Sequence, residues 1–171
     1  MKKMIKICAL TALFLGLASV TFAQVSATAT ATGTIVTPIG ISTTTNMNFG
    51  NAAVSSALGT VIMTPASTRT ATGGVTLPVV SGTVTAAAFA VTGVANYTYA
   101  ITLPGSATSI SDGNGHTMSV DTWTSDPTPT GTLDGTGAQT LYVGATLHVA
   151  GSQVAGTYVS GTPFTVTVNY N

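Results

Sequence analysis

The chain has 171 residues and very few charges: four lysines and arginines, four acidic residues, all of them aspartate, and two histidines. Three of the basic residues are Lys2, Lys3 and Lys6, so the rest of the chain carries one arginine, Arg69, against four aspartates, a net charge of −3. This charge balance excludes a basic surface for nucleic acid. The single cysteine, Cys8, excludes a disulfide framework and a zinc site of several thiolates.

Residues 1–23 have the three parts of a secretory signal peptide. The lysines form a basic start, Ile7–Val20 is uncharged and apolar, and Thr21–Ala23 ends in the small residues that a signal peptidase accepts. The apolar run is too short for a comfortable membrane span. We therefore expect cleavage after Ala23 and export to the periplasm, the cell surface or the medium. The mature chain, Gln24–Asn171, is expected to form a single β-sandwich domain without a membrane span.

The mature chain begins with a long alternation of apolar and polar residues. The apolar face is formed by Val25, Ala27, Ala29, Ala31 and Ile35, with threonines between most of them. A period of two predicts a β-strand over Val25–Ile41, which Pro38 bends or places at a sheet edge. No charge guards this strand against pairing with another chain.

Eight further strands are predicted from apolar runs bounded by turn-forming residues. They are Met47–Phe49, Thr60–Met63, Val75–Val80, Ala86–Val91, Tyr97–Leu103, Thr117–Trp123, Thr140–Val149 and Phe164–Tyr170. Turns are expected at Gly73-Gly74 and Asp112–Gly115, and a loop over Ser125–Gly137. Short strands without helical periodicity predict an all-β protein, an Ig-like Greek-key β-sandwich of about eight or nine strands.

The last predicted strand has the clearest alternation. From Phe164 to Tyr170, apolar and aromatic residues occupy every second position and threonine or asparagine the others. We expect one core built from the inward residues of four strands: Phe89, Tyr99, Ile101, Leu103, Val143, Leu147, Phe164, Val166 and Val168. Because the given sequence ends in this strand, we expect no later segment to close the sandwich. A strand borrowed from another molecule is one way to close it.

The residues that could carry chemistry are few. His148 falls on the outward side of its strand and His116 lies beside a predicted turn, so both are interpreted as structural or solvated. The four aspartates adjoin glycine, proline or threonine and are interpreted as turn formers, not as a catalytic pair or a calcium loop. We predict no enzyme activity, no catalytic or metal-binding residues and no cofactor. Trp123 is expected to pack at the rim of the core in preference to stacking on a sugar.

A series of short motifs runs through the mature chain. They are Asn48–Gly50, Thr68–Gly74, Ala88-Phe89 with Val91–Gly93, Tyr97–Pro104, Leu141–Leu147, Gly156–Tyr158 and Phe164–Asn171. This ordered set resembles the DUF4402 family of exported bacterial proteins, which brings no catalytic residues. More distantly, the layout is similar to spore-coat U proteins and to cysteine-free pilin subunits of the archaic chaperone–usher type. That similarity implies that the N-terminal segment completes the sandwich of a neighbouring subunit.

Two functional interpretations remain open. In the first, the protein is a non-enzymatic surface protein, a fimbria-like or adhesive subunit, whose partners are itself or related subunits. The strand-exchange segment would then be Val25–Ile35, inserted beside Phe164–Tyr170 of a neighbour. In the second, the N-terminal strand closes its own sheet, and the monomer binds a surface glycan or a protein ligand. An enzyme is the third and least favoured hypothesis.

Overall fold

The computed structural model describes residues 23–171, so the predicted signal peptide lies outside the described residues apart from Ala23. The described chain divides after Thr34 into two units. In the first, every residue from Ala23 to Thr34 is exposed and none belongs to a strand. The predicted strand Val25–Ile41 is therefore wrong, except that Gly40 and Ile41 open the first strand of the second unit. Alanine side chains bury too little apolar area to offset the entropy of ordering such a segment.

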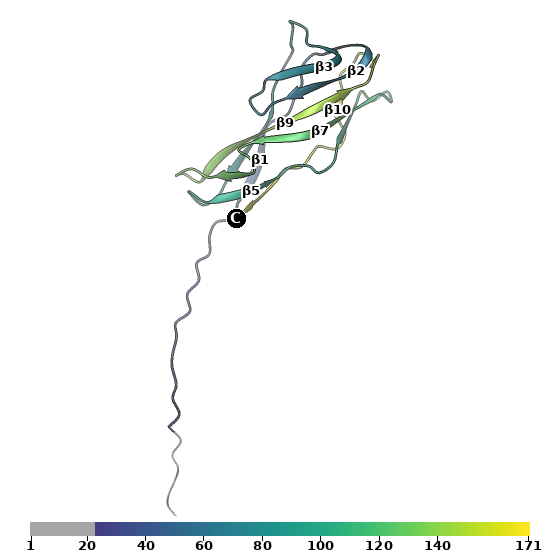
Figure 1. Ribbon diagram of the computed structural model, residues 1–171. Helices are drawn as coiled ribbons and strands as arrows, with labels where there is room; N and C mark the ends of the chain where they lie inside the picture. Colours follow the sequence, from purple (N-terminus) through teal and green to yellow (C-terminus); the bar gives the residue numbers. More distant parts are fainter. Residues whose placement is uncertain (1–22) are drawn as a thin grey trace, which may run out of the picture. The chain divides into compact units, whose positions relative to one another are not determined.

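Residues 35–171 form an all-β, antiparallel sandwich of eleven strands in two sheets (Figure 1). The larger sheet has the order β1-β4-β9-β7-β6-β10, and β2 joins it by pairing with β9 on one side and β3 on the other. Its strands are β1 (Gly40–Thr45), β2 (Ala53–Met63), β3 (Arg69–Thr76), β4 (Ala87–Thr92), β6 (Thr108–Ser111), β7 (Thr117–Asp126), β9 (Ala138–Val149) and β10 (Val159–Ser160). The smaller sheet has the order β11-β5-β8. Its strands are β5 (Thr98–Thr102), β8 (Thr130–Thr132) and β11 (Thr167–Tyr170). The predicted β-sandwich is confirmed.

The strand β9 is the centre of the larger sheet. Its first half pairs with β4, its second half pairs with β2, and β7 covers its other side. The alternation predicted over Thr140–Val149 is confirmed, because the inward residues are all buried and His148 is exposed. These inward residues are Leu141, Val143, Ala145, Leu147 and Val149.

The core is divided into two clusters, so the expectation of one core is wrong. The first lies between the two sheets and holds Phe89, Tyr99, Val143, Val166 and Val168, with Ile101, Leu103 and Phe164 packed half-buried against it. The second lies under β2, β7 and the second half of β9, and includes Leu147. Trp123 packs against both clusters. The three-stranded sheet is too small to cover the full length of β9, which is why a second cluster forms.

Gly73 and Gly74 were expected to form a turn, but they lie inside β3. The chain turns instead over Pro65–Ser67. Opposite the glycines, the register of β2 shifts so that Ser55–Leu58 forms an arch. A Cβ atom on Gly74 would lie 2.0 Å from the carbonyl oxygen of Ala57, so the arch needs a glycine there.

Three short strands, β6, β8 and β10, were not predicted, and β8 lies within the expected loop Ser125–Gly137. The strand predicted over Val75–Val80 is displaced, because β3 runs from Arg69 to Thr76 and only its last two residues fall in the predicted range, while Val79 and Val80 are exposed. The predicted strand Met47–Phe49 is reduced to one bridge between Asn48 and Thr85. The Asp112–Gly115 turn is confirmed and joins β6 to β7.

Arg69 opens β3 and is the one lysine or arginine among the described residues. Its guanidinium group donates hydrogen bonds to three backbone carbonyls. It bonds the oxygens of Phe49, of Asn51 at 2.7 Å and of Ser81 at 3.3 Å. Arg69 therefore fastens the segment before β2 to the loop after β3.

Candidate functional site

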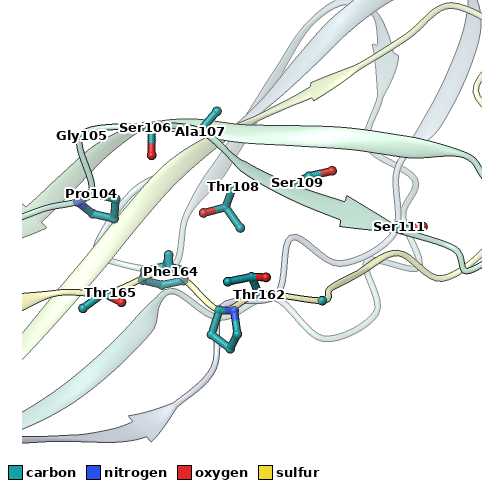
Figure 2. A pocket seen from close by; sticks show the side chains of 12 residues that line it. Pro104, Gly105, Ser106, Ala107, Thr108, Ser109, Ser111, Thr162, Phe164 and Thr165 are labelled. Atoms are coloured by element: carbon teal, nitrogen blue, oxygen red, sulfur yellow. The ribbon is translucent and has the colours of Figure 1, made fainter.

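An open groove of about 630 Å³ lies beside the segment that leads into the terminal strand (Figure 2). One wall is β6 with the loop before it, and the other is the irregular segment before β11. The lining residues are Pro104, Gly105, Ser106, Ala107, Thr108, Ser109, Ser111, Gly161, Thr162, Pro163, Phe164 and Thr165. None of these side chains carries a charge. Thr108, Thr162 and Phe164 lie in the space between the two walls (Figure 2).

The wall formed by β6 is an incompletely covered sheet edge. On one side, all four residues of β6 pair with β7. On the other side, the short strand β10 pairs only with Ile110 and Ser111. Among the described strands, none pairs with Thr108 or Ser109 on that side, so this part of the edge faces the groove. Unpaired backbone groups at such an edge can accept a further strand.

Phe164 is the one aromatic residue that lines the groove, and it packs against two further aromatic side chains. The rings of Trp123 and Phe164 lie with centroids 4.4 Å apart, and Phe164 meets Phe89 edge to face at 6.3 Å. The indole nitrogen of Trp123 donates to the carbonyl oxygen of Ser106 at 3.4 Å. Core or rim packing of Trp123, the favoured prediction, is confirmed, since the residue is half-buried against Phe164.

A bulge in β7 explains how Trp123 reaches this position. In simple alternation from Met118 and Val120, Trp123 would point outward. The register of β7 on β9 shifts between Asp121 and Thr124, and Thr122 has a φ of 51°. The extra residue reverses the alternation, so that Trp123 and Ser125 follow Val120 on the inward side.

The residues predicted for strand exchange belong to no strand of the described chain. Val25, Ala27, Ala29 and Ala31 are exposed, as is Ile35 at 99%. They form no part of a sheet among the described residues.

The aspartates and histidines form two separate pairs. The Nδ1 atom of His116 lies 2.6 Å from Oδ2 of Asp112 in the β6–β7 turn, and Nε2 of His148 lies 2.7 Å from Oδ1 of Asp121 across β7 and β9. The interpretation of all aspartates as turn formers is thus wrong for Asp121 and Asp126, which belong to β7.

Hydrogen bonds hold these carboxylates in their charged form. The hydrogen bond with His116, helped by the N–H groups of Asn114 and His116, lowers the pKa of Asp112 to about 2. His148 and then the Thr122 hydroxyl lower the pKa of Asp121. Hydrogen bonds from Thr136 and from the N–H of Ala138 lower the pKa of Asp134, which caps a turn as predicted.

These pairs stabilise turns and strands, and their geometry does not complete a catalytic group. Ser119 lies opposite His148 in the register, but in the described chain no hydrogen bond joins the two side chains. Over residues 23–171, no three metal-binding side chains come together at one point. The groove beside Phe164 is therefore the candidate site, and the chemistry it offers is strand and apolar contact.

Sequence reasoning missed the groove because it missed β6. Thr108–Ser111 contains one large apolar residue, Ile110, so it gives no alternation that could be recognised. The prediction for the other wall is partly correct. The terminal strand is predicted to begin at Phe164, but regular pairing starts at Thr167. Pro163, which has no N–H to donate, was the available signal that this wall is irregular.

The fold defines a class, antiparallel β-sandwich proteins with an incompletely covered edge. Within it, the chain belongs to the family described as "Domain of unknown function (DUF4402)", whose model matches residues 39–170. The resemblance to the DUF4402 family is thus confirmed, and the exposed segment Val25–Pro38 lies outside the match. No curated protein matches the chain, and no solved structure does. Over residues 23–171, no helix has the length and apolar character needed to cross a membrane.

Proposed function

We propose that this protein is a non-enzymatic structural subunit of the bacterial surface, fimbria-like or adhesive, that is exported and assembles by strand addition. The observation that carries the proposal is the coexistence, in one chain, of an exposed alternating segment and an uncovered sheet edge. The segment Val25–Ile35 pairs with no strand, and the edge at Thr108 and Ser109 faces an open groove.

The chemistry of the two parts is compatible. A strand that enters the groove gains backbone hydrogen bonds along β6 and presents alternate side chains to Phe164. The apolar face of the segment carries alanine at three successive positions, and small side chains suit a groove that already holds the side chain of Phe164. Neither partner carries a charge, so no desolvation of ionised groups opposes the contact.

An assembly of this kind is head-to-tail. Each subunit gives its segment to one neighbour and receives another in its groove, so the contact propagates into a fibre unless it closes into a ring. Ordering the segment has an entropic cost, which limits the affinity of each contact.

The test uses the mature chain Gln24–Asn171 and changes the segment first. Ala29→Asp places a charge on the apolar face and should abolish assembly, whereas Thr30→Asp on the opposite face should preserve it. Assembly is measured by analytical ultracentrifugation and electron microscopy. A synthetic peptide of residues 24–35 should bind the Ala29→Asp protein.

A second pair of variants changes the groove. Gly161 lines the groove, and a Cβ atom there would have no neighbour within 4 Å, so Gly161→Trp is chosen to fill the space. Gly135 is equally open but lies outside the groove, which makes Gly135→Trp the matched control. Loss of assembly in the first alone supports the proposal. A full mature chain that stays monomeric at high concentration contradicts it and favours a monomeric module that binds a glycan or protein.

A further inference from the structure

A second open edge lies on the opposite margin of the larger sheet, at β3. The strand β3 pairs with β2 alone and ends the sheet on that side (Figure 1). With eight residues it is the longest edge strand of the described chain. The other edge strands are β1 with six residues and a bulge at Thr44, β11 with four, β8 with three and β10 with two.

No charged side chain lies in the middle of this edge to oppose pairing with another strand. Sheet edges that must stay single usually carry lysine, proline or an inward charge. In β3, the one charged side chain is Arg69, and its guanidinium group is bonded to backbone carbonyls away from the middle of the strand. Thr70 and Thr72 are exposed and Ala71 is half-buried. The regular part of the edge, from Arg69 to Thr72, ends at the bulge of Gly73, which has a φ of 64°.

We propose that two copies of this chain associate through antiparallel pairing of β3 with β3, around a two-fold axis at Ala71. A two-fold axis perpendicular to the sheet keeps the outer face of both copies on the same side. Residues directly opposite each other in an antiparallel pair have their side chains on the same face of the sheet. The two-fold axis must therefore pass through a residue, and not between two residues. Centring on Ala71 sets Thr70 of each copy opposite Thr72 of the other.

The same contact already occurs within the subunit. Thr72 lies opposite Thr60 of β2, and their hydroxyl oxygens are 2.7 Å apart. This pair belongs to a row of polar side chains that crosses five strands through Thr72, Thr60, His148, Ser119 and Ser109. A hydroxyl has one donor and two acceptor sites, so Thr72 can bond both Thr60 and Thr70 of a second copy. Threonine pairs across strands are stabilising.

We expect the dimer to be weak, because the regular part of the edge is short. About four regular residues on each copy make a contact smaller than a standard interface. It is independent of the strand exchange proposed above, because it uses the opposite margin of the sheet and closes after two copies. Strand exchange instead gives an open series of oligomers. The variant Ala29→Asp separates the two kinds of association, because it blocks strand exchange and leaves the β3 dimer intact.

Two double variants of the mature chain test the pairing and its register. In Thr70→Lys with Thr72→Lys, each lysine faces a lysine of the second copy, and the dissociation constant should rise about tenfold. In Thr70→Lys with Thr72→Glu, each lysine faces a glutamate, and dimerisation should be kept. Both are measured by sedimentation equilibrium in the Ala29→Asp background and in the unchanged mature chain.

Equal dimerisation of the two double variants, or its loss in both, would overturn the proposed pairing. The proposal would also be overturned if the Ala29→Asp protein stayed monomeric at about 1 mM, because the dissociation constant would then be too high for a functional contact. Hydrogen exchange on the protein without β3 substitutions gives a check that does not depend on the variants folding. Amide protection in Arg69–Thr72 should rise with protein concentration, while protection in β1 should not change.

Discussion

Two segments of this chain have the same sequence pattern, but only one of them forms a β-strand. Val25–Ile35 and Phe164–Tyr170 both alternate apolar with polar residues, mostly threonine, and neither carries a charge. The second segment contains β11 and buries Val166 and Val168, whereas every residue of the first is exposed and outside any strand. Alternation therefore determines which face of a strand is apolar, but it does not decide whether the strand forms.

The difference lies in the size of the inward side chains. The terminal segment presents Phe164, Val166, Val168 and Tyr170, which give several times the apolar area of alanine. Burial contributes roughly 25 cal/mol per Å², while fixing each backbone residue costs about 1–2 kcal/mol. Valine and phenylalanine bring enough area to offset that cost in one copy of the chain. Three alanines do not, so their segment needs a preformed edge.

The largest expected effect comes from placing a charge in the buried face of the terminal segment. Val166→Asp puts an unpaired carboxylate between the two sheets, next to Tyr99 and Val168, and should cost about 3 kcal/mol or more, enough to unfold a marginal domain. Thr167→Asp is the control, because Thr167 is exposed, and should cost less than about 0.5 kcal/mol. Urea denaturation measures both. Equal losses would mean that the assigned faces of the strand are wrong.

A smaller effect is expected when the terminal strand is made to resemble the exposed segment. Val168→Ala removes two buried methyl groups and should lower the free energy of unfolding by about 2 kcal/mol. Thermal unfolding followed by circular dichroism measures the loss. If the variant keeps the stability of the parent protein, side-chain size is not what separates the two segments.

The reverse change is expected to strengthen assembly. Ala29→Val adds apolar area to the exposed segment, and in the proposed polymer it should tighten the contact by about 1 kcal/mol, close to fivefold. The concentration at which oligomers appear in sedimentation velocity provides the measurement. Thr30→Val adds similar bulk to the other face and serves as the control. An equal gain from both would indicate general stickiness without a defined strand face.

The smallest effect concerns polar contacts in the β6–β7 turn. His116 and the nearby N–H groups hold the pKa of Asp112 at about 2, so this carboxylate stabilises the fold at neutral pH and loses that contribution as the pH falls towards 2. In His116→Ala the pKa of Asp112 should rise, so the loss, which begins near the unfolded-state pKa in both proteins, should end at a higher pH and be smaller in total. Carboxyl titration by NMR reports the pKa, and an unchanged value would refute the assignment of His116 as its main cause.

The sequence was sufficient for the strongly patterned elements. In β9 and in the terminal segment, the inward residues were correctly predicted, because large apolar residues at a period of two leave one possible face. The family resemblance was also correct for residues 39–170. Both successes depend on side chains whose burial dominates the local energy.

Other elements could not be predicted because distant contacts decide them. Gly73 and Gly74 gave a turn signal, yet they are needed where the Ser55–Leu58 arch approaches β3. The inward position of Trp123 depends on the bulge at Thr122, which a single sequence does not reveal. The strand β6 is stabilised by its pairing with β7, and its own residues carry little apolar signal.

The hydrogen bonds of Arg69 with backbone carbonyls bear on how the stability of the protein depends on salt concentration. The guanidinium group is bonded to the carbonyl oxygens of Phe49, Asn51 and Ser81, and such short contacts with neutral dipoles are little affected by mobile ions. Charges elsewhere in the described chain are few. Folding should therefore proceed almost equally well in dilute buffer and in concentrated sodium chloride, so that ionic strength has little influence on the stability of this protein.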